Sequence, residues 1–558
     1  MKNINYIFGF YFLLFAYLYF FTLNFNYVEG DDASTILYHL CGRNAQIQQP
    51  YASYNSGLDF LLEISHLHSE ASLRTFAVLV SFIAGFLVLC LFAVFLDVFF
   101  DDVEKINAKN KIYFCLLLPF IVPDIIFHSL IVNSAYISFV FLLGSLIVFI
   151  KFLKTNRNLF LYISTVLFAI AIPFRWTMLI SLPLYMGFAL YYHPIQYYSK
   201  NTLLLFLKIG TANVVGVILA LFFIYITGYN LVDFYNTVVS TTQYIENSEK
   251  SALVFVSTAS AFLTPSLLFL VFLGCIRIYQ QNKKRSKYGL SMLGLVVLSI
   301  SPCFVVGFFP SYKFLITLLP MLLIVMGIGF DYLSDKKPLL IVFLLLVIVP
   351  WFIGIQLDAK GTFCGPGFEL NTQKTEGSIS QQENPDQRVK IDGVNFKLDS
   401  GFYLPMLEGP RPLYGYFYVL FGNGWKNQID LFTQERQNTV EILIKNKNVV
   451  YIQARKTAYL QCDLYRYGWR TQTDFIEGKN ILYRNFKNNN TAIRIYVVPD
   501  NCSKNEWIED CFKTTNRTVI YSSSQSNEIL KLLKNEENKI EVLGPFTVLN
   551  KQKNKVND

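Results

Sequence analysis

The sequence predicts a polytopic bundle of α-helices in a membrane, followed by a C-terminal extracytoplasmic domain of the α/β or α+β class. Three observations carry this prediction. The chain of 558 residues is 53% hydrophobic, with a mean hydropathy of +0.37, which is too apolar for a soluble protein of this length. Long apolar runs fill residues 1–356, whereas residues 357–558 are polar and mixed. The basic residues gather in alternate loops between the apolar runs.

About eleven of these runs are long enough to cross a bilayer core of about 30 Å as a helix. The first run lacks a small-x-small cleavage site, so we expect a retained span rather than a cleaved signal peptide. Pro119, Pro123 and Pro173 interrupt the third to sixth runs, where the connections are very short. The predicted spans are 5–24, 73–97, 112–127, 131–152, 158–174, 176–192, 202–228, 251–275, 289–309, 313–333 and 338–356.

The loops between the spans predict the orientation. With the N-terminus in the cytoplasm, the inner loops are rich in lysine and arginine: Lys105, Lys109, Lys111, Lys154, Arg157, Lys200, Arg277, Lys283, Lys284, Arg285, Lys287, Lys336 and Lys337. The membrane-flanking outer loops hold only Arg43, Arg74, Arg175, Lys250 and Lys313. This asymmetry follows the positive-inside rule and accounts for the net charge of +9, so we expect no nucleic-acid partner.

An odd number of spans places residues 357–558 outside the cytoplasm. Residues 361–387 are rich in turn-forming and polar residues and predict a linker or a long loop. Short apolar or alternating runs at 440–444, 449–452, 493–498 and 540–542 then predict strands. Cys502 and Cys511 bracket a short polar loop and could close a disulfide in an oxidising compartment. We therefore divide the chain into a membrane unit, residues 1–356 with a first outer loop at 25–72, and an outer domain, residues 357–558.

Three carboxylates follow the first span directly: Glu29, Asp31 and Asp32. An apolar stripe at helical spacing comes next, which indicates a short helix along the membrane surface. A carboxylate in this place could deprotonate a substrate hydroxyl, or hold a divalent metal ion, for which Asp31 is the candidate. In the alternative interpretation, Asp31 or Asp32 merely caps the surface helix.

Two basic residues and one polar pair lie on the same predicted side of the membrane. Arg175 and Lys313 could bind a lipid-linked phosphate whose tail lies between helices. Asp124, His128 and Arg43 are candidates for a supporting role. Arg175 and Lys313 could instead anchor their helices by reaching to lipid head groups, and His128 could be a packing residue.

Four segments resemble the GT-C superfamily of integral-membrane glycosyltransferases, in the branch of the protein O-mannosyltransferases and the lipid A aminoarabinose transferases. The acidic pair with its surface helix, Gly30-Asp-Asp-Ala-Ser-Thr-Ile-Leu-Tyr-His39, is followed by the aromatic-proline segment Gln49-Pro-Tyr-Ala-Ser-Tyr54. Phe174-Arg-Trp-Thr-Met-Leu-Ile-Ser-Leu-Pro183 resembles the basic span that ends in proline. Pro310-Ser-Tyr-Lys-Phe-Leu-Ile-Thr-Leu-Leu-Pro320 resembles the Arg-Tyr segment near the last helices.

The resemblance implies an inverting transfer of a sugar from a polyprenyl-phosphate donor to a lipid, glycan or protein acceptor. By the family pattern Asp31 matches the catalytic or metal-coordinating aspartate, Asp32 stands where the family often has glutamate, and Lys313 matches the residue at the donor phosphate. We expect Asp32 and Glu29 to support Asp31, and Arg175 to bind the same phosphate. Lysine at position 313 departs from the usual arginine and loses the bidentate contact. We expect an enzyme of a bacterial inner membrane. A transporter or flippase for a lipid-linked or small anionic substrate is the main alternative, and an assembly or sensor protein is a third.

Overall fold

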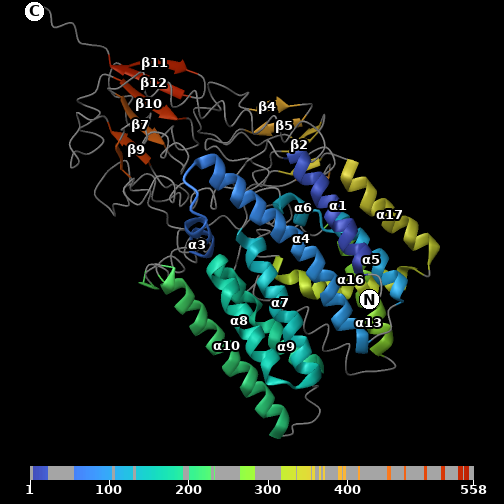
Figure 1. The fold of residues 1–558 in the computed structure, drawn as a ribbon. Coiled ribbons are helices and arrows are strands. Elements are labelled where there is room, and N and C mark those ends of the chain that lie inside the picture. Colours follow the sequence, from blue (N-terminus) through green and yellow to red (C-terminus); the bar gives the residue numbers. More distant parts are fainter. Residues whose placement is uncertain are drawn as a thin grey trace, which may run out of the picture.

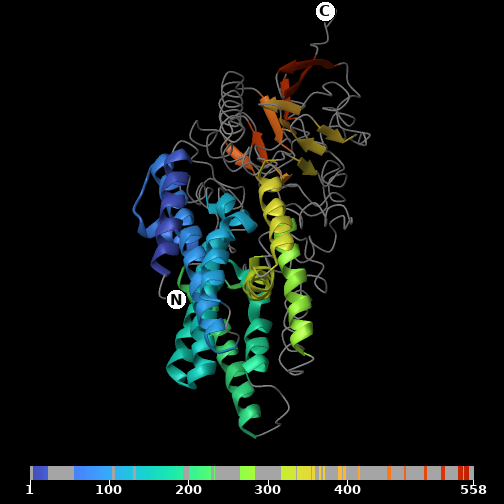
Figure 2. The same cartoon turned by 90° about the vertical axis from the view of Figure 1, so that its right-hand side faces the viewer.

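The structure, a computed structural model, consists of a helical bundle and a group of strands beyond one end of it (Figures 1 and 2). Among the described elements, every helix belongs to the first 352 residues of the chain and every strand follows them. The structure describes residues 4–22, 56–103, 107–129, 134–192, 200–227, 231–232, 235, 264–282, 316–334 and 336–352, together with the strands β1–β12.

The described helices follow the apolar runs of the sequence. Their bounds are α1 (Ile4–Thr22), α3 (Ser56–Ile64), α4 (Glu70–Val103), α5 (Ala108–Ile121), α6 (Asp124–Ser129), α7 (Ser134–Thr155), α8 (Asn158–Phe174), α9 (Leu182–Tyr192), α10 (Lys200–Ile226), α13 (Pro265–Asn282), α16 (Leu319–Ser334) and α17 (Lys337–Phe352). Two 3-10 helices complete them, η3 (Trp176–Ser181) and η4 (Ile316–Leu318).

Three of the described helices are long and apolar enough to cross a membrane, namely α4 within 72–100, α7 over 134–155 and α10 within 203–226. The predicted membrane character of the bundle is thereby confirmed. A helix lies at each predicted span that falls within the described residues, with α13 covering the end of span 251–275. The total of eleven spans stays a prediction, because span 289–309 lies outside the described residues.

Two predicted spans differ from the structure by a break in the helix. The predicted span 112–127 is two helices, because α5 ends at Ile121 and α6 begins at Asp124. Pro123 lacks a backbone N–H and disfavours helical backbone at Val122, whose φ of −121° and ψ of 69° are non-helical. The predicted span 176–192 begins as η3 and continues as α9, and extended backbone at Arg175 separates it from α8.

The helix α16 lies at the centre of the bundle, since nearly all of its side chains are buried whichever way they point. It crosses α13 at a very short distance. A Cβ atom added to Gly274 would overlap the backbone carbonyl of Val325, and one added to Gly329 would overlap that of Leu270. Glycine at these positions therefore permits the backbones of α13 and α16 to touch, as small residues commonly do between membrane helices.

Hydroxyl groups join α7, α8 and α9 near the middle of the bundle. Ser145 on α7 donates a hydrogen bond to the backbone carbonyl of Ser164 on α8 at 2.7 Å, and the Ser164 hydroxyl donates to the carbonyl of Ser145 at 3.0 Å. The Tyr185 hydroxyl on α9 lies 2.6 Å from Ser145 Oγ. All three side chains are buried, so each hydroxyl finds its partner inside the protein.

The strands form three sheets. A four-stranded sheet has the order β3-β2-β1-β6, a six-stranded sheet has the order β11-β12-β10-β7-β9-β8, and β4 pairs with β5. Within the described strands, β10 and β7 run parallel and the other pairs are antiparallel. Their bounds are β1 (Ile355–Leu357), β2 (Phe363–Gly365), β3 (Phe368–Leu370), β4 (Arg388–Ile391), β5 (Val394–Lys397), β6 (Pro412–Tyr414), β7 (Val449–Gln453), β8 (Arg470–Gln472), β9 (Ile495–Val498), β10 (Arg517–Tyr521), β11 (Asn538–Leu543) and β12 (Phe546–Lys551).

Three predicted strands have counterparts in the structure, because β7, β9 and β11 lie at the alternating runs. The predicted run 440–444 lies outside the described residues. The predicted linker 361–387 was wrong at its start, where β2 and β3 form an antiparallel pair. A phenylalanine opens each of these strands, and aromatic residues favour pleated backbone. The extracytoplasmic side and the outer bound of this region stay predictions.

Candidate functional site

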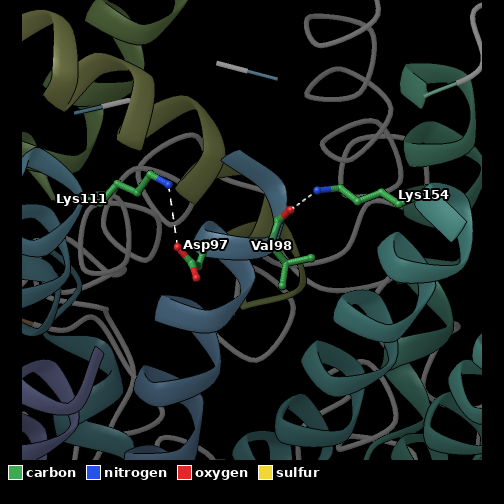
Figure 3. A network of polar contacts seen from close by, with 4 residues as sticks. All are labelled: Asp97, Val98, Lys111 and Lys154. Carbon is green, nitrogen blue, oxygen red and sulfur yellow. Dashed lines mark hydrogen bonds and ion pairs between the residues drawn. The ribbon is translucent and has the colours of Figure 1, made fainter. Parts of the chain in front are cut away.

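Described helix ends that flank the predicted cytoplasmic loops meet at one end of the bundle, which we call the basic end. Figure 3 shows two contacts there: Lys111 on α5 lies 3.8 Å from the Asp97 carboxylate on α4, and Lys154 on α7 donates a hydrogen bond to the backbone carbonyl of Val98. The Lys154 ammonium thus adds a bond to a carbonyl near the C-terminal end of α4, where the helix dipole favours a positive charge. Both contacts connect helix ends across the bundle.

Further polar contacts bring α10, α13 and α16 to the same end. Asn110 on α5 donates to the Asp331 carboxylate on α16 at 2.8 Å. The Arg277 guanidinium on α13 lies 5.6 Å from the centre of the Tyr332 ring, a distance typical of a cation–π contact. Lys208 on α10 bonds to the side chain of Asn158 on α8. The helix ends that the positive-inside rule assigns to one side of the membrane therefore lie together.

At the other end of the bundle, which we call the opposite end, side chains donate hydrogen bonds to backbone carbonyls of α5. Thr264 at the start of α13 donates to the backbone carbonyl of Ile121 at 2.6 Å. The Trp351 indole N–H on α17 donates to the carbonyl of Phe120 at 3.0 Å. These bonds satisfy free carbonyls at the C-terminal end of α5. Since β1 follows α17 closely, the strands lie beyond this end (Figure 2).

The segment between α8 and α9 carries the polar groups of the opposite end. Arg175 stands in the helix break, with an extended backbone of φ −159° and ψ 102°, and η3 begins at the next residue. Arg175 is only 6% exposed, Trp176 7% and Thr177 3%. The 3-10 helix η3 contacts η4, which begins three residues after Lys313 in the chain. The buried guanidinium of Arg175 thus lies where the backbone between α8 and α9 is not α-helical.

A buried acidic residue, Asp59, lies close to this segment. It is 8% exposed and stands one turn after Ser56 on α3, so the two side chains share a face of that helix. Ser56 donates to the backbone carbonyl of Pro173 at 3.3 Å, and a Cβ added to Gly57 would lie 2.9 Å from the Phe174 ring. The face of α3 that carries Asp59 therefore rests on the C-terminal end of α8.

Asp59 and Arg175 are the only charged residues that are buried among those whose burial the structure describes. Taking a charge out of water is costly unless it gains a partner, so such residues in membrane proteins usually serve a substrate or an ion pair. Both lie at the opposite end of the bundle. Of the two, the guanidinium is the group suited to a phosphate.

Most of the predicted site residues fall outside the described part of the chain. These are Glu29, Asp31, Asp32, Arg43 and Lys313, and the predicted disulfide partners Cys502 and Cys511. Asp124 and His128 belong to the short helix α6, which contacts α4. Arg175 is the predicted site residue whose side chain the structure describes, and it is buried. Which of the others meet it stays a prediction.

The sequence analysis did not single out Asp59 or Thr177. A detectable signal existed for Asp59, since it is an acid between the apolar residues Leu58 and Leu62 on a helix with one strongly apolar face. Thr177 carries no comparable signal, because a threonine in an apolar run is as common in packing as in binding. Within the described residues, no group of three His, Cys, Asp or Glu side chains could hold a metal ion.

Comparison with known proteins adds no relative. No protein family, no curated protein and no solved structure matches this chain.

Proposed function

We propose that the chain is a membrane glycosyltransferase of the GT-C type, which moves a sugar from a polyprenyl-phosphate donor to a lipid, glycan or protein acceptor. The observation that carries the proposal is the position of Arg175. It is buried at the end of the bundle away from the lysine-rich loops, in a break between helices, and the following η3 contacts η4. Lys313 precedes η4 by three residues in the sequence, and three residues span at most about 11 Å, so we expect it near this contact.

In this proposal the two cations bind the donor phosphate. Cleaving the bond between the sugar and the phosphate leaves negative charge on the phosphate, and cations fixed nearby stabilise that charge. A guanidinium in a site shielded from water acts more strongly than one in solution, because the surroundings screen it less. The buried Arg175 would supply most of this stabilisation, and Lys313 would add a single-point contact.

The acidic loop supplies the other half of the reaction. Asp31 would take the proton from the acceptor hydroxyl as it attacks the anomeric carbon, with Asp32 and Glu29 orienting the acceptor. Attack opposite to the leaving phosphate inverts the configuration at that carbon. A divalent metal ion bound by Asp31 is compatible with these roles, since carboxylate oxygens are the ligands that magnesium, calcium and manganese prefer.

The proposed orientation places the basic end in the cytoplasm and the reaction on the outer face of a bacterial inner membrane. The gathering of Lys111, Lys154, Arg277 and Lys336 at one end of the bundle supports it. The strands would then form an outer domain over residues 357–558. Only 22% of the most apolar stretch of α10 is buried inside the protein, so lipids would cover its exposed apolar side chains.

The alternative of a transporter or flippase requires the basic end to open during each cycle. Three contacts between different helices oppose this opening: Lys111 with Asp97, Lys154 with the Val98 carbonyl, and Asn110 with Asp331. In addition, the buried charges lie at the opposite end rather than halfway along the bundle, where transporters bind their substrates. These observations favour the enzyme.

The test of the proposal is the substitution Asp31→Asn in the purified full-length protein. Removing the proposed base should abolish sugar transfer from a polyprenyl-phosphate donor, while thermal unfolding stays unchanged. Glu63→Gln is the matched control, because Glu63 is an exposed acid on α3 at the same end, and it should keep full activity. Normal transfer by the Asp31→Asn protein would refute the assigned mechanism.

A further inference from the structure

The hydroxyl of Thr177 is an exception among the buried serine and threonine hydroxyls of the described bundle. Within the part of the chain that the structure describes, Thr177 Oγ1 is buried and makes no hydrogen bond, and its residue is 3% exposed. No other buried serine or threonine hydroxyl among the described residues lacks a hydrogen-bond partner. Ser138, for example, donates to the carbonyl of Ala171 at 2.6 Å, and Ser181 donates to that of Met178 at 2.6 Å.

An unsatisfied hydroxyl inside a protein lowers the stability of the fold, because it has lost its bonds to water and gained none in return. Valine has nearly the same shape and would remove this penalty. A buried threonine hydroxyl that makes no hydrogen bond within the described protein therefore calls for a reason other than packing. Its position supplies one, since only Trp176 separates it from the buried Arg175.

We infer that Thr177 is a further donor-binding residue, whose hydroxyl donates a hydrogen bond to an oxygen of the phosphate that Arg175 binds. The inference rests on the proposed function. Two residues apart, the Cα atoms of Arg175 and Thr177 lie within about 7 Å, a distance that a guanidinium and a hydroxyl can bridge around one phosphate. The contact of η3 with η4 places the chain that follows Lys313 against the same segment.

The ligand class is a phosphate monoester or diester carried on a prenyl chain. The guanidinium supplies the charge, and the hydroxyl adds a hydrogen bond of fixed direction. A hydrogen bond to a charged group is stronger than one between neutral groups, so loss of the hydroxyl should weaken binding about tenfold. The prenyl chain would contribute through burial of its apolar surface.

The first part of the test separates a binding hydroxyl from a structural one. Thr177→Val in the full-length protein should leave the midpoint of thermal unfolding unchanged or raise it. Thr264→Val is the matched control, since Thr264 is a threonine at the same end that is equally buried but bonded to the Ile121 carbonyl. Its loss should lower the midpoint by about 2–5 °C.

The second part measures binding of farnesyl phosphate, with farnesol as the probe without phosphate. Farnesyl phosphate should stabilise the wild-type protein against heat, and farnesol should do so far less. Thr177→Val should weaken the affinity for farnesyl phosphate about tenfold, whereas Thr177→Ser, which keeps a hydroxyl, should restore most of it. The affinity for farnesol should be the same in all variants.

Each contrary outcome is decisive. If Thr177→Val lowers the midpoint as Thr264→Val does, the hydroxyl is structural and the inference fails. If Thr177→Val binds farnesyl phosphate as the wild type does, while Arg175→Met does not, the inference fails but the proposed site stands. If farnesyl phosphate fails to stabilise the wild type, the proposed function fails, together with the ligand assigned to Thr177.

Discussion

The two ends of the helical bundle hold their charges in different ways. At the basic end, the partners are within the protein: Lys111 meets Asp97, Lys154 meets a backbone carbonyl, and Lys208 meets Asn158. At the opposite end, Asp59 and Arg175 are buried where α3 rests on the end of α8. Charge at the basic end serves orientation and helix packing, whereas the two charged side chains at the opposite end are removed from water, as is common at functional sites of membrane proteins.

The comparison is tested most strongly by removing one cation from each end. Arg175→Met should reduce sugar transfer about 1,000-fold, because the proposed site loses the charge that stabilises the leaving phosphate. Arg157→Met is the control, since Arg157 is an exposed arginine at the basic end, and its rate should stay within about twofold of the wild type. Measured with the same polyprenyl-phosphate donor, equal losses for both variants would show that the ends do not differ in function.

The helix α16 joins the two ends, so damage at its crossing with α13 should affect both. Gly274→Val would place side-chain atoms against the Val325 carbonyl and should lower the free energy of unfolding by about 3 kcal/mol. Gly210→Ala on α10 is the matched control, because no atom lies within 4 Å of the position of its Cβ.

Alanine has the higher helix propensity, so Gly210→Ala should be neutral or stabilising by up to about 1 kcal/mol. Chemical unfolding in detergent, followed by circular dichroism, measures both variants. A Gly274→Val protein as stable as the wild type would mean that α13 and α16 do not cross in contact.

The smallest effect is expected at the ion pair of the basic end. Lys111→Met should lower the free energy of unfolding by about 1 kcal/mol and leave sugar transfer unchanged, because this pair is partly solvated and serves packing. A double-mutant cycle with Asp97→Asn isolates the pair, and the coupling should be about 0.5–1 kcal/mol. A large loss of transfer without a loss of stability would instead give the basic end a catalytic role.

Hydropathy was sufficient to place the helices, because in a membrane protein nearly every apolar run of span length forms a helix. The breaks were harder to place. Pro123 signals the end of α5, and the predicted spans 158–174 and 176–192 already separate at Arg175, but nothing in the sequence marks the 3-10 turn of η3. The close contact of α13 with α16 was equally hidden, since glycine is common in membrane helices and only the partner helix reveals its purpose.

The sequence predicted residues of the candidate site only where a charge beside an apolar span marked them. Arg175 was found because an arginine beside an apolar span is rare and costly. Asp59 and Thr177 were missed because their importance lies in burial, which depends on where α3 and η3 pack rather than on the neighbouring residues in the chain. The roles of Asp31 and Lys313 stay predictions, since both lie outside the described residues.

The hydroxyl contacts between α7, α8 and α9 have a consequence for the conditions under which the bundle holds together. Ser145, Ser164 and Tyr185 bind one another without a formal charge, and the Tyr11 hydroxyl likewise donates to the backbone carbonyl of Cys115 at 2.6 Å. Neutral hydrogen bonds in a buried place are little affected by dissolved ions or by mild acid. Changes in salt and acidity should therefore act on the two ends of the bundle while its middle keeps its packing.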